Sequence, residues 1–207
     1  MLGWKSEYER FSEIDLKEFQ LFTIGTDFAI SEKEEADYSA IDVAGLGKDG
    51  KIYNILSEKG KWTPDETFRK IANYFNFYQK FALTICGIED VGYQRIARDE
   101  LMRRFGISPY LIKRTTDKRA RVLMIQPYFQ NSQIFFSKND GDLINQLRNF
   151  GNIDEDDLVD AFEMAVSLVK NYFELEPAPD KGPKTYKERL IERAYRRNEE
   201  GDYQIEY

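Results

Sequence analysis

The chain has 207 residues, of which 37 are acidic and 30 are basic, so its formal net charge is −7. It contains no histidine and a single cysteine, Cys86. These counts exclude Ser-His-Asp and Cys-His nucleophile systems, His-ligated zinc and a disulfide framework. Any chemistry must therefore use carboxylates and lysines, together with a hard cation bound through oxygen.

Hydropathy argues against a membrane protein. No apolar run approaches the roughly 18–20 residues that span a bilayer, and the amino-terminus lacks the apolar core of a signal peptide. Low cysteine use fits a reducing cytoplasm. We therefore expect no membrane partner.

Four short apolar runs in the first half of the chain predict β-strands. They span residues 21–29, 38–46, 51–57 and 82–88. The Gly/Asp-rich link at 47–50 indicates a hairpin between the second and third runs. The fourth run is almost continuously apolar, as in a strand buried on both faces, so its Cys86 is interpreted as an inert core residue. A polar lead-in or linker is expected over residues 1–17.

Helices are expected after the third strand and again, alternating with short strands, after the fourth. Thr63, Pro64 and Glu66 supply an N-cap, a proline at the first helical position and the acid of a capping box. Periodicity and caps predict further helices at 92–105, 116–127 and 140–150, one opening at the acidic run 154–157, and short strands at 109–113 and 133–137. This order predicts an α/β fold with a mixed β-sheet flanked by helices. The ribonuclease H-like arrangement has the same order, although order alone does not make it unique.

Asp27 and Glu89 each follow the end of a predicted core strand. In open α/β sheets, sites form outside the carboxyl ends of the strands. If the first and fourth strands are neighbours, both carboxylates emerge together, and Asp156 and Asp157 complete the cluster from the start of a helix. Two unit charges about 4 Å apart repel by about 4 kcal/mol at an effective dielectric of about 20, so the cluster needs protons or cations. Mg²⁺ and Mn²⁺ suit such oxygen-only ligands.

Each of these acids also has an ordinary structural interpretation. The run 154–157 is equally consistent with a helix amino-terminus, where acids interact favourably with the helix dipole. Asp27 is consistent with a strand-end turn, and Glu89 with a turn or the cap of the next helix. Only their joint placement favours a metal site.

Basic residues concentrate between Arg95 and Arg121, although the chain is acidic overall. This segment has nine positive and three negative side chains, a local excess of six. The candidate DNA contacts within it are Lys113, Arg114, Lys118, Arg119 and Arg121. A basic segment beside a carboxylate site suits a polyanionic substrate, because phosphate contacts supply most sequence-independent affinity. A solvated helix face with internal ion pairs is the alternative interpretation.

A series of short motifs resembles the nuclease domain of tailed-phage large terminase subunits. In chain order they are Gly25-Thr26-Asp27, Asp37-Tyr38-Ser39-Ala40, Ile88-Glu89, Asp117-Lys118-x-x-Arg121 and Asp156-Asp157-Leu158-Val159-Asp160-Ala161. The resemblance covers about residues 20–170, and the last motif is the most specific. Many members carry His before the Asp-Asp pair, where this chain has Asp154-Glu155. This departure leaves open which acid is the third ligand; we favour Asp156, followed by Asp157.

The resemblance implies a ribonuclease H-like endonuclease that cuts concatemeric double-stranded viral DNA during genome packaging, related in fold to Holliday-junction resolvases. It implies two divalent ions, Mg²⁺ or Mn²⁺, that hydrolyse the phosphodiester by in-line displacement. The implied ligands are Asp27, Glu89, Asp156 and Asp157. Lys118 would approach the scissile phosphate or the attacking water.

Large terminases also carry a packaging ATPase, but no G-x-x-x-x-G-K-[ST] loop occurs in this chain. We therefore expect an isolated nuclease domain at residues 18–176, followed by a charged tail with a helix at 177–207. By the resemblance, the full-length protein would add an ATPase domain and would bind the portal and the small terminase subunit in the host cytoplasm. Two alternatives remain open: another ribonuclease H-like nuclease, of the junction resolvase or recombinase type, and a non-catalytic module that docks on DNA or the portal.

Overall fold

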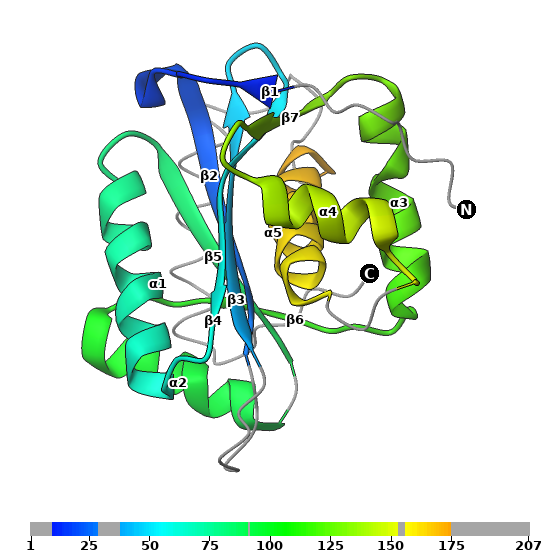
Figure 1. Cartoon of the computed structure of the whole chain (residues 1–207). Coiled ribbons are helices and arrows are strands. Elements are labelled where there is room, and N and C mark those ends of the chain that lie inside the picture. Colours follow the sequence, from blue (N-terminus) through cyan, green and yellow to red (C-terminus); the bar gives the residue numbers. More distant parts are fainter. Residues whose placement is uncertain (1–9, 29–37, 91, 153–155, 175–207) are drawn as a thin grey trace.

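A mixed β-sheet of seven strands forms the middle layer of the protein, and helices cover both of its faces (Figure 1). The computed structural model describes residues 10–28, 38–90, 92–152 and 156–174. The strands are β1 (Arg10–Phe11), β2 (Phe19–Asp27), β3 (Ser39–Gly47), β4 (Ile52–Gly60), β5 (Leu83–Glu89), β6 (Tyr110–Ile112) and β7 (Ile134–Ser137). The helices are the 3-10 helix η1 (Leu16–Glu18), α1 (Pro64–Tyr78), α2 (Gly92–Phe105), α3 (Lys118–Gln130), α4 (Gly141–Asn149) and α5 (Asp157–Glu174). The helix expected in the tail lies outside the described residues.

The strands lie in the order β1-β7-β4-β3-β2-β5-β6. The first three long strands, β2, β3 and β4, form an antiparallel meander, whereas the other neighbouring strands pair in parallel. The predicted α/β fold with a mixed sheet flanked by helices is therefore confirmed. No helix in the described part of the chain is both long and apolar enough to cross a bilayer.

Helix α1 begins where its sequence signals place it. The Thr63 hydroxyl accepts a hydrogen bond from the Glu66 N–H at 3.3 Å, and the Glu66 carboxylate accepts one from the Thr63 N–H at 2.8 Å. This reciprocal arrangement satisfies two backbone donors that a helix start would otherwise leave free. The capping box read from the sequence is confirmed.

Two local features differ from the sequence-based expectations. Residues 10 and 11, within the expected lead-in, pair in parallel with β7 as the edge strand β1. A two-residue strand carries no periodicity from which it could be predicted. Helix α3 continues through Pro127 to Gln130, because its last turn is closed by a hydrogen bond from the Asn131 N–H to the Pro127 carbonyl at 3.0 Å and anchored by buried Phe129.

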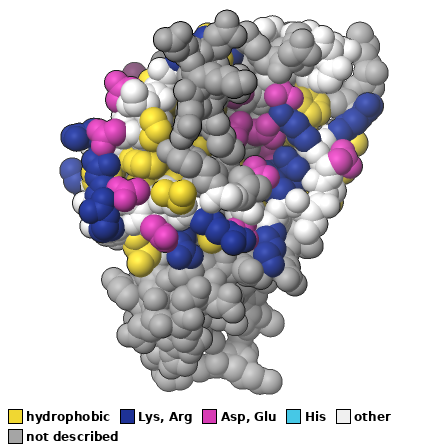
Figure 2. All heavy atoms as spheres, turned by 90° about the horizontal axis from the view of Figure 1, so that it is seen from below, with side chains coloured by type: hydrophobic (Ala, Val, Ile, Leu, Met, Phe, Trp, Pro, Cys, Tyr) yellow, Lys and Arg dark blue, Asp and Glu magenta, His cyan; other side chains and the backbone are white. Residues whose placement is uncertain are grey.

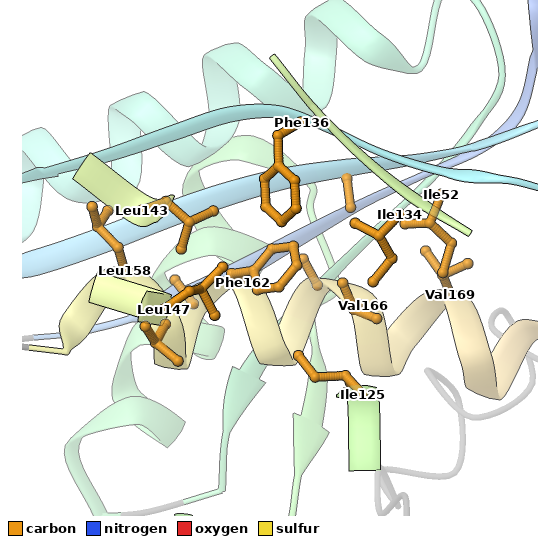
Figure 3. Packing of buried hydrophobic residues seen from close by; sticks show 14 of the residues in the cluster. Ile52, Ile125, Ile134, Phe136, Leu143, Leu147, Leu158, Phe162, Val166 and Val169 are labelled. Carbon is orange, nitrogen blue, oxygen red and sulfur yellow. The ribbon is translucent and has the colours of Figure 1, made fainter. Parts of the chain in front are cut away.

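The sheet separates two hydrophobic cores. One face packs against α1 and α2, and the other packs against α3, α4 and α5 (Figure 1). In the second core, Phe162 of α5 lies against Phe136 of β7, with their ring centroids 5.5 Å apart, and Val166 and Leu147 line the same interior (Figure 3). Helix α5 is thus enclosed between the sheet and two other helices, which fixes its position over the centre of the sheet.

Two glycines allow α5 to approach the sheet closely. A Cβ atom on Gly25 of β2 would lie 2.1 Å from the Ala161 carbonyl oxygen and 2.6 Å from the Ala165 backbone nitrogen. A Cβ atom on Gly87 of β5 would lie 2.8 Å from side-chain atoms of Leu168 and Ile112. The absence of a side chain at Gly25 therefore sets the distance between the α5 backbone and the strand that ends at Asp27.

We expect Gly25→Ala to lower the free energy of unfolding by at least about 2 kcal/mol, because the new methyl group would meet backbone atoms rather than a movable side chain. Urea unfolding followed by circular dichroism measures this change. Gly141→Ala is the matched control, since its added Cβ has nothing within 4 Å; it should be neutral or slightly stabilising. Equal stability of the two variants would contradict the close approach of α5.

Candidate metal centre at the carboxyl ends of β2 and β5

Asp27 and Glu89 end two neighbouring parallel strands. Strands β2 and β5 pair with Thr26 opposite Ile88, so the next residue on each strand is an acid. Successive side chains of a strand point to opposite faces, and Gly25 and Gly87 face α5. Asp27 and Glu89, two residues further on, therefore emerge on the α5 side. The adjacency that the sequence argument required of the first and fourth strands is confirmed.

Helix α5 brings three more acids to this edge through its start. The backbone carbonyl of Asp156 accepts hydrogen bonds from the N–H groups of Val159 and Asp160, at 2.9 and 3.1 Å. The Gln146 side chain of α4 accepts a bond from the Leu158 N–H at 3.1 Å, which satisfies another donor of the first turn. This anchoring places Asp156, Asp157 and Asp160 within one helical turn.

The acids from the strands and from α5 interact strongly through space. Burial, followed by the negative charges of Asp160 and Asp157 and then that of Glu89, raises the pKa of Asp27 to about 7. Burial also raises the pKa of Asp160 and of Asp157, while the positive charges of Lys118 and Lys59 act in the opposite direction. Asp157, Asp160 and Glu89 thus all act on Asp27, and we call these four acids the carboxylate cluster: Asp27, Glu89, Asp157 and Asp160.

Lys118 brings a positive charge to the cluster. It is the first residue of α3, whose start is capped by the Asp117 carboxylate accepting the Ala120 N–H at 3.1 Å. The Lys118 ammonium lies 2.6 Å from a carboxylate oxygen of Asp156 and also pairs with Asp160. Although burial opposes it, hydrogen bonding to these two acids raises the pKa of Lys118.

A second ionic group lies deeper between α3 and α5. Glu163 pairs with Arg114 and, at 3.3 Å, with Arg121, and it accepts a hydrogen bond from the Ser167 hydroxyl at 2.7 Å. The side chains of Glu163 and Arg114 are only 4% and 6% exposed. Arg121 also reaches Asp160 at 3.4 Å, so this buried pair is continuous with the carboxylate cluster.

Among the predicted site residues, the structure brings together Asp27, Glu89, Asp157 and Lys118. Asp156 lies beside them as a partner of Lys118. Sequence reasoning missed Asp160, although it has the largest influence of any single charge on Asp27. The signal was present, because Asp160 follows Asp157 by three residues and Asp156 by four, the spacings that share one helix face.

Of the five predicted DNA contacts, Lys118 pairs with Asp156 and Asp160, and the other four divide into two groups. Arg119 is exposed and Lys113 is half-buried. Arg114 and Arg121 instead point into the protein and pair with Glu163, which gives them a structural role. Contact of any of the five basic residues with DNA stays a prediction. Seen from below, along the direction in which β2 and β5 end, Lys and Arg side chains lie close to Asp and Glu side chains (Figure 2).

The chemistry of the cluster fits a hard divalent cation. Its donors are all carboxylate oxygens, which Mg²⁺ and Mn²⁺ prefer, and their mutual repulsion is relieved by positive charge. Among the described residues, however, no three carboxylates lie close enough together to form a ready-made site for an ion. Part of the negative charge is balanced in two other ways. Asp27 retains its proton to a higher pH because its pKa is raised, and the Lys118 ammonium pairs with Asp160.

The fold is the ribonuclease H-like α/β fold of viral terminase nucleases, as three solved structures show. The large terminase nuclease of the thermophilic phage G20c with bound zinc has a TM-score of 0.55 at 20% identity, covering 77% of this chain and 92% of that one. The P22 large terminase nuclease domain has a TM-score of 0.57 at 10% identity, covering 78% and 86%. The human cytomegalovirus terminase nuclease domain, Mn-soaked and inhibitor-bound, has a TM-score of 0.56 at 15% identity, covering 77% and 89%.

The likeness lies in the structure and extends over most of the chain. No protein-family model and no curated sequence matches this protein. At 20% identity or below, the three structures establish the fold. The terminase-nuclease resemblance drawn from the motifs is thereby confirmed at the level of the fold.

Proposed function

We propose that the protein is a metal-dependent endonuclease of the terminase type, which cuts concatemeric double-stranded viral DNA during genome packaging. The observation that supports this proposal most directly is the carboxylate cluster, because it lies outside the carboxyl ends of two parallel strands in a terminase-nuclease fold. Zinc bound to the phage G20c nuclease and manganese soaked into the cytomegalovirus domain support a divalent ion.

In this proposal, Asp27, Glu89, Asp157 and Asp160 would hold the ions, with Asp156 at the edge of the group. Two divalent ions, when bound, would supply an activated water and charge stabilisation for the leaving oxygen of an in-line displacement. Asp27 has to release its proton to take part, because a protonated carboxyl is a poor ligand. Exposed Arg119 and half-buried Lys113 would contact the DNA backbone.

Supercoiled plasmid incubated with the protein and Mn²⁺ or Mg²⁺ tests the proposal. We expect nicking and linearisation that EDTA abolishes. Asp160→Asn should slow cleavage by about 100-fold or more, since weakening a single group that only orients a metal ligand already costs about 10–100-fold. The matched control is Asp142→Asn, an exposed acid in the first turn of α4, which should cut as fast as the wild type.

Three outcomes would contradict this function. If no divalent ion supports cleavage, or if Asp160→Asn cuts as fast as Asp142→Asn, the carboxylate cluster is not the catalytic centre. Cleavage of four-way junctions in clear preference to linear duplex would instead favour a resolvase. The packaging partners, namely an ATPase domain, the portal and a small terminase subunit, are tested separately by co-purification with the viral proteins.

A further inference from the structure

The positive charge of Lys118 acts on three acids of the carboxylate cluster, namely Asp27, Asp157 and Asp160. Its ammonium contacts carboxylate oxygens of both Asp156 and Asp160, and its charge lowers the pKa of Asp27 against the effects of burial and of the other acids. One flexible side chain thus reaches the two acids of the α5 start and acts on the acid that ends β2. Two of these three acids, Asp27 and Asp160, are also proposed ligands of a bound cation.

The Lys118 side chain is fixed at its base by the helix start, and its ammonium is held only by ion pairs to acids. Its backbone begins α3, where the Asp117 cap fixes the first turn. The side chain is 33% exposed, whereas that of Arg114, which pairs deeper between the same two helices, is 6% exposed. A lysine has four flexible methylene groups and a compact charge, so the ammonium can leave the acids for solvent without any change in the helix.

We propose that Lys118 is a tethered cation that balances part of the negative charge of the carboxylate cluster in the metal-free protein, and that a divalent ion must displace it in order to bind. The inference rests on the proposed function, because Asp160, with which Lys118 pairs, is one of the proposed metal ligands. It gives Lys118 a role that precedes any contact with DNA.

The charges of the competing groups make the exchange favourable when the metal is abundant. The ammonium brings one positive charge and hydrogen bonds to two acids, whereas a divalent ion brings two charges and binds several carboxylates at once. The contacts of Lys118 are lost when the ion enters, which weakens net metal affinity. Lys118 therefore lowers affinity for the ion while it stabilises the metal-free protein.

Isothermal titration with Mn²⁺, together with thermal unfolding in EDTA, tests this role in full-length Lys118→Met. We expect the Mn²⁺ dissociation constant to fall by about 10-fold or more, and the metal-free melting temperature to fall as well. Mn²⁺ should then raise the melting temperature of the variant by more than that of the wild type. Lys118→Arg keeps the charge and should keep weak Mn²⁺ binding.

Lys51→Met is the control for the loss of one lysine charge, because Lys51 lies beside the β3–β4 hairpin at the opposite end of the sheet. It should leave the Mn²⁺ dissociation constant unchanged. Equal or weaker Mn²⁺ binding by Lys118→Met than by the wild type would overturn the inference and leave the nuclease proposal standing. Failure of every variant and of the wild type to bind Mn²⁺ would overturn both.

Discussion

Asp27→Asn is expected to abolish cleavage and, at the same time, to stabilise the metal-free protein at pH 8. The pKa of Asp27 is about 7 in the folded protein, well above the value of 3.8 for an unperturbed aspartate. Between these two values the folded state retains a proton that the unfolded state has released, so stability falls as the pH rises. The loss is about 1.4 kcal/mol per pH unit and reaches about 4 kcal/mol at pH 8. Asparagine cannot ionise, so the free energy of unfolding of the variant does not fall with pH through this group.

Urea unfolding in EDTA from pH 5 to pH 8 measures the effect. The advantage of Asp27→Asn over the wild type should grow between pH 5 and pH 7 and level off above. Asp142→Asn removes an exposed acid and controls for the change in net charge. An advantage that stays constant across this range would show that Asp27 is not held in a repulsive, desolvated environment. A gain in stability with a loss of activity is the usual sign of a group kept for function.

Glu163→Gln is expected to destabilise the protein by about 3–5 kcal/mol, because it removes the negative charge on which a buried guanidinium depends. Arg114 is 6% exposed and its positive charge would be left without its carboxylate partner. Breaking one side of a buried ion pair leaves the other charge uncompensated, which costs far more than losing a surface pair. Arg121 would lose the same partner and keep its contacts with Asp160 and the Thr116 carbonyl.

Glu18→Gln is the matched control, because it breaks an exposed ion pair where Glu163→Gln breaks a buried one. Glu18 pairs with Lys48 at 3.6 Å on the surface, where both side chains are more than half exposed, so its loss should change stability by less than about 0.5 kcal/mol. Urea midpoints at pH 7 give both values. If the two variants unfold alike, the Arg114–Glu163–Arg121 group does not hold α3 against α5.

Much of the fold could be predicted from the sequence, because its main elements carry local signals. Apolar runs indicated the long strands, and the Thr63 capping box marked the start of α1. The two-residue strand β1 could not be predicted, since its pairing with β7 joins residues more than 120 positions apart. Nor does any pattern reveal that Asp42, within an apolar strand, is fully buried and accepts hydrogen bonds from Asn54 and Ser57 at 2.6 Å.

In the candidate site, the positions of the acidic residues could be predicted better than the contacts of the basic residues. Strand ends and a helix start are local features, so Asp27, Glu89 and the Asp156–Asp157 pair could be found by position. Asp160 has the right spacing, but the adjacent pair Asp156–Asp157 is the more conspicuous signal in the sequence. The direction of an arginine side chain depends on which helix lies opposite. For this reason the sequence does not reveal that Arg114 and Arg121, both predicted DNA contacts, pair with Glu163 of α5.

The position of α5 at the end of the described chain has a consequence for synthesis. The acids of the strands are made early, but Asp157 and Asp160 lie on the helix that also fills the core beneath them, down to Tyr172. A growing polypeptide therefore has to be synthesised past Asp160 before the four carboxylates can meet. Products truncated between residues 90 and 156 would contain Asp27 and Glu89 without their partners, and could not assemble the cluster on their own.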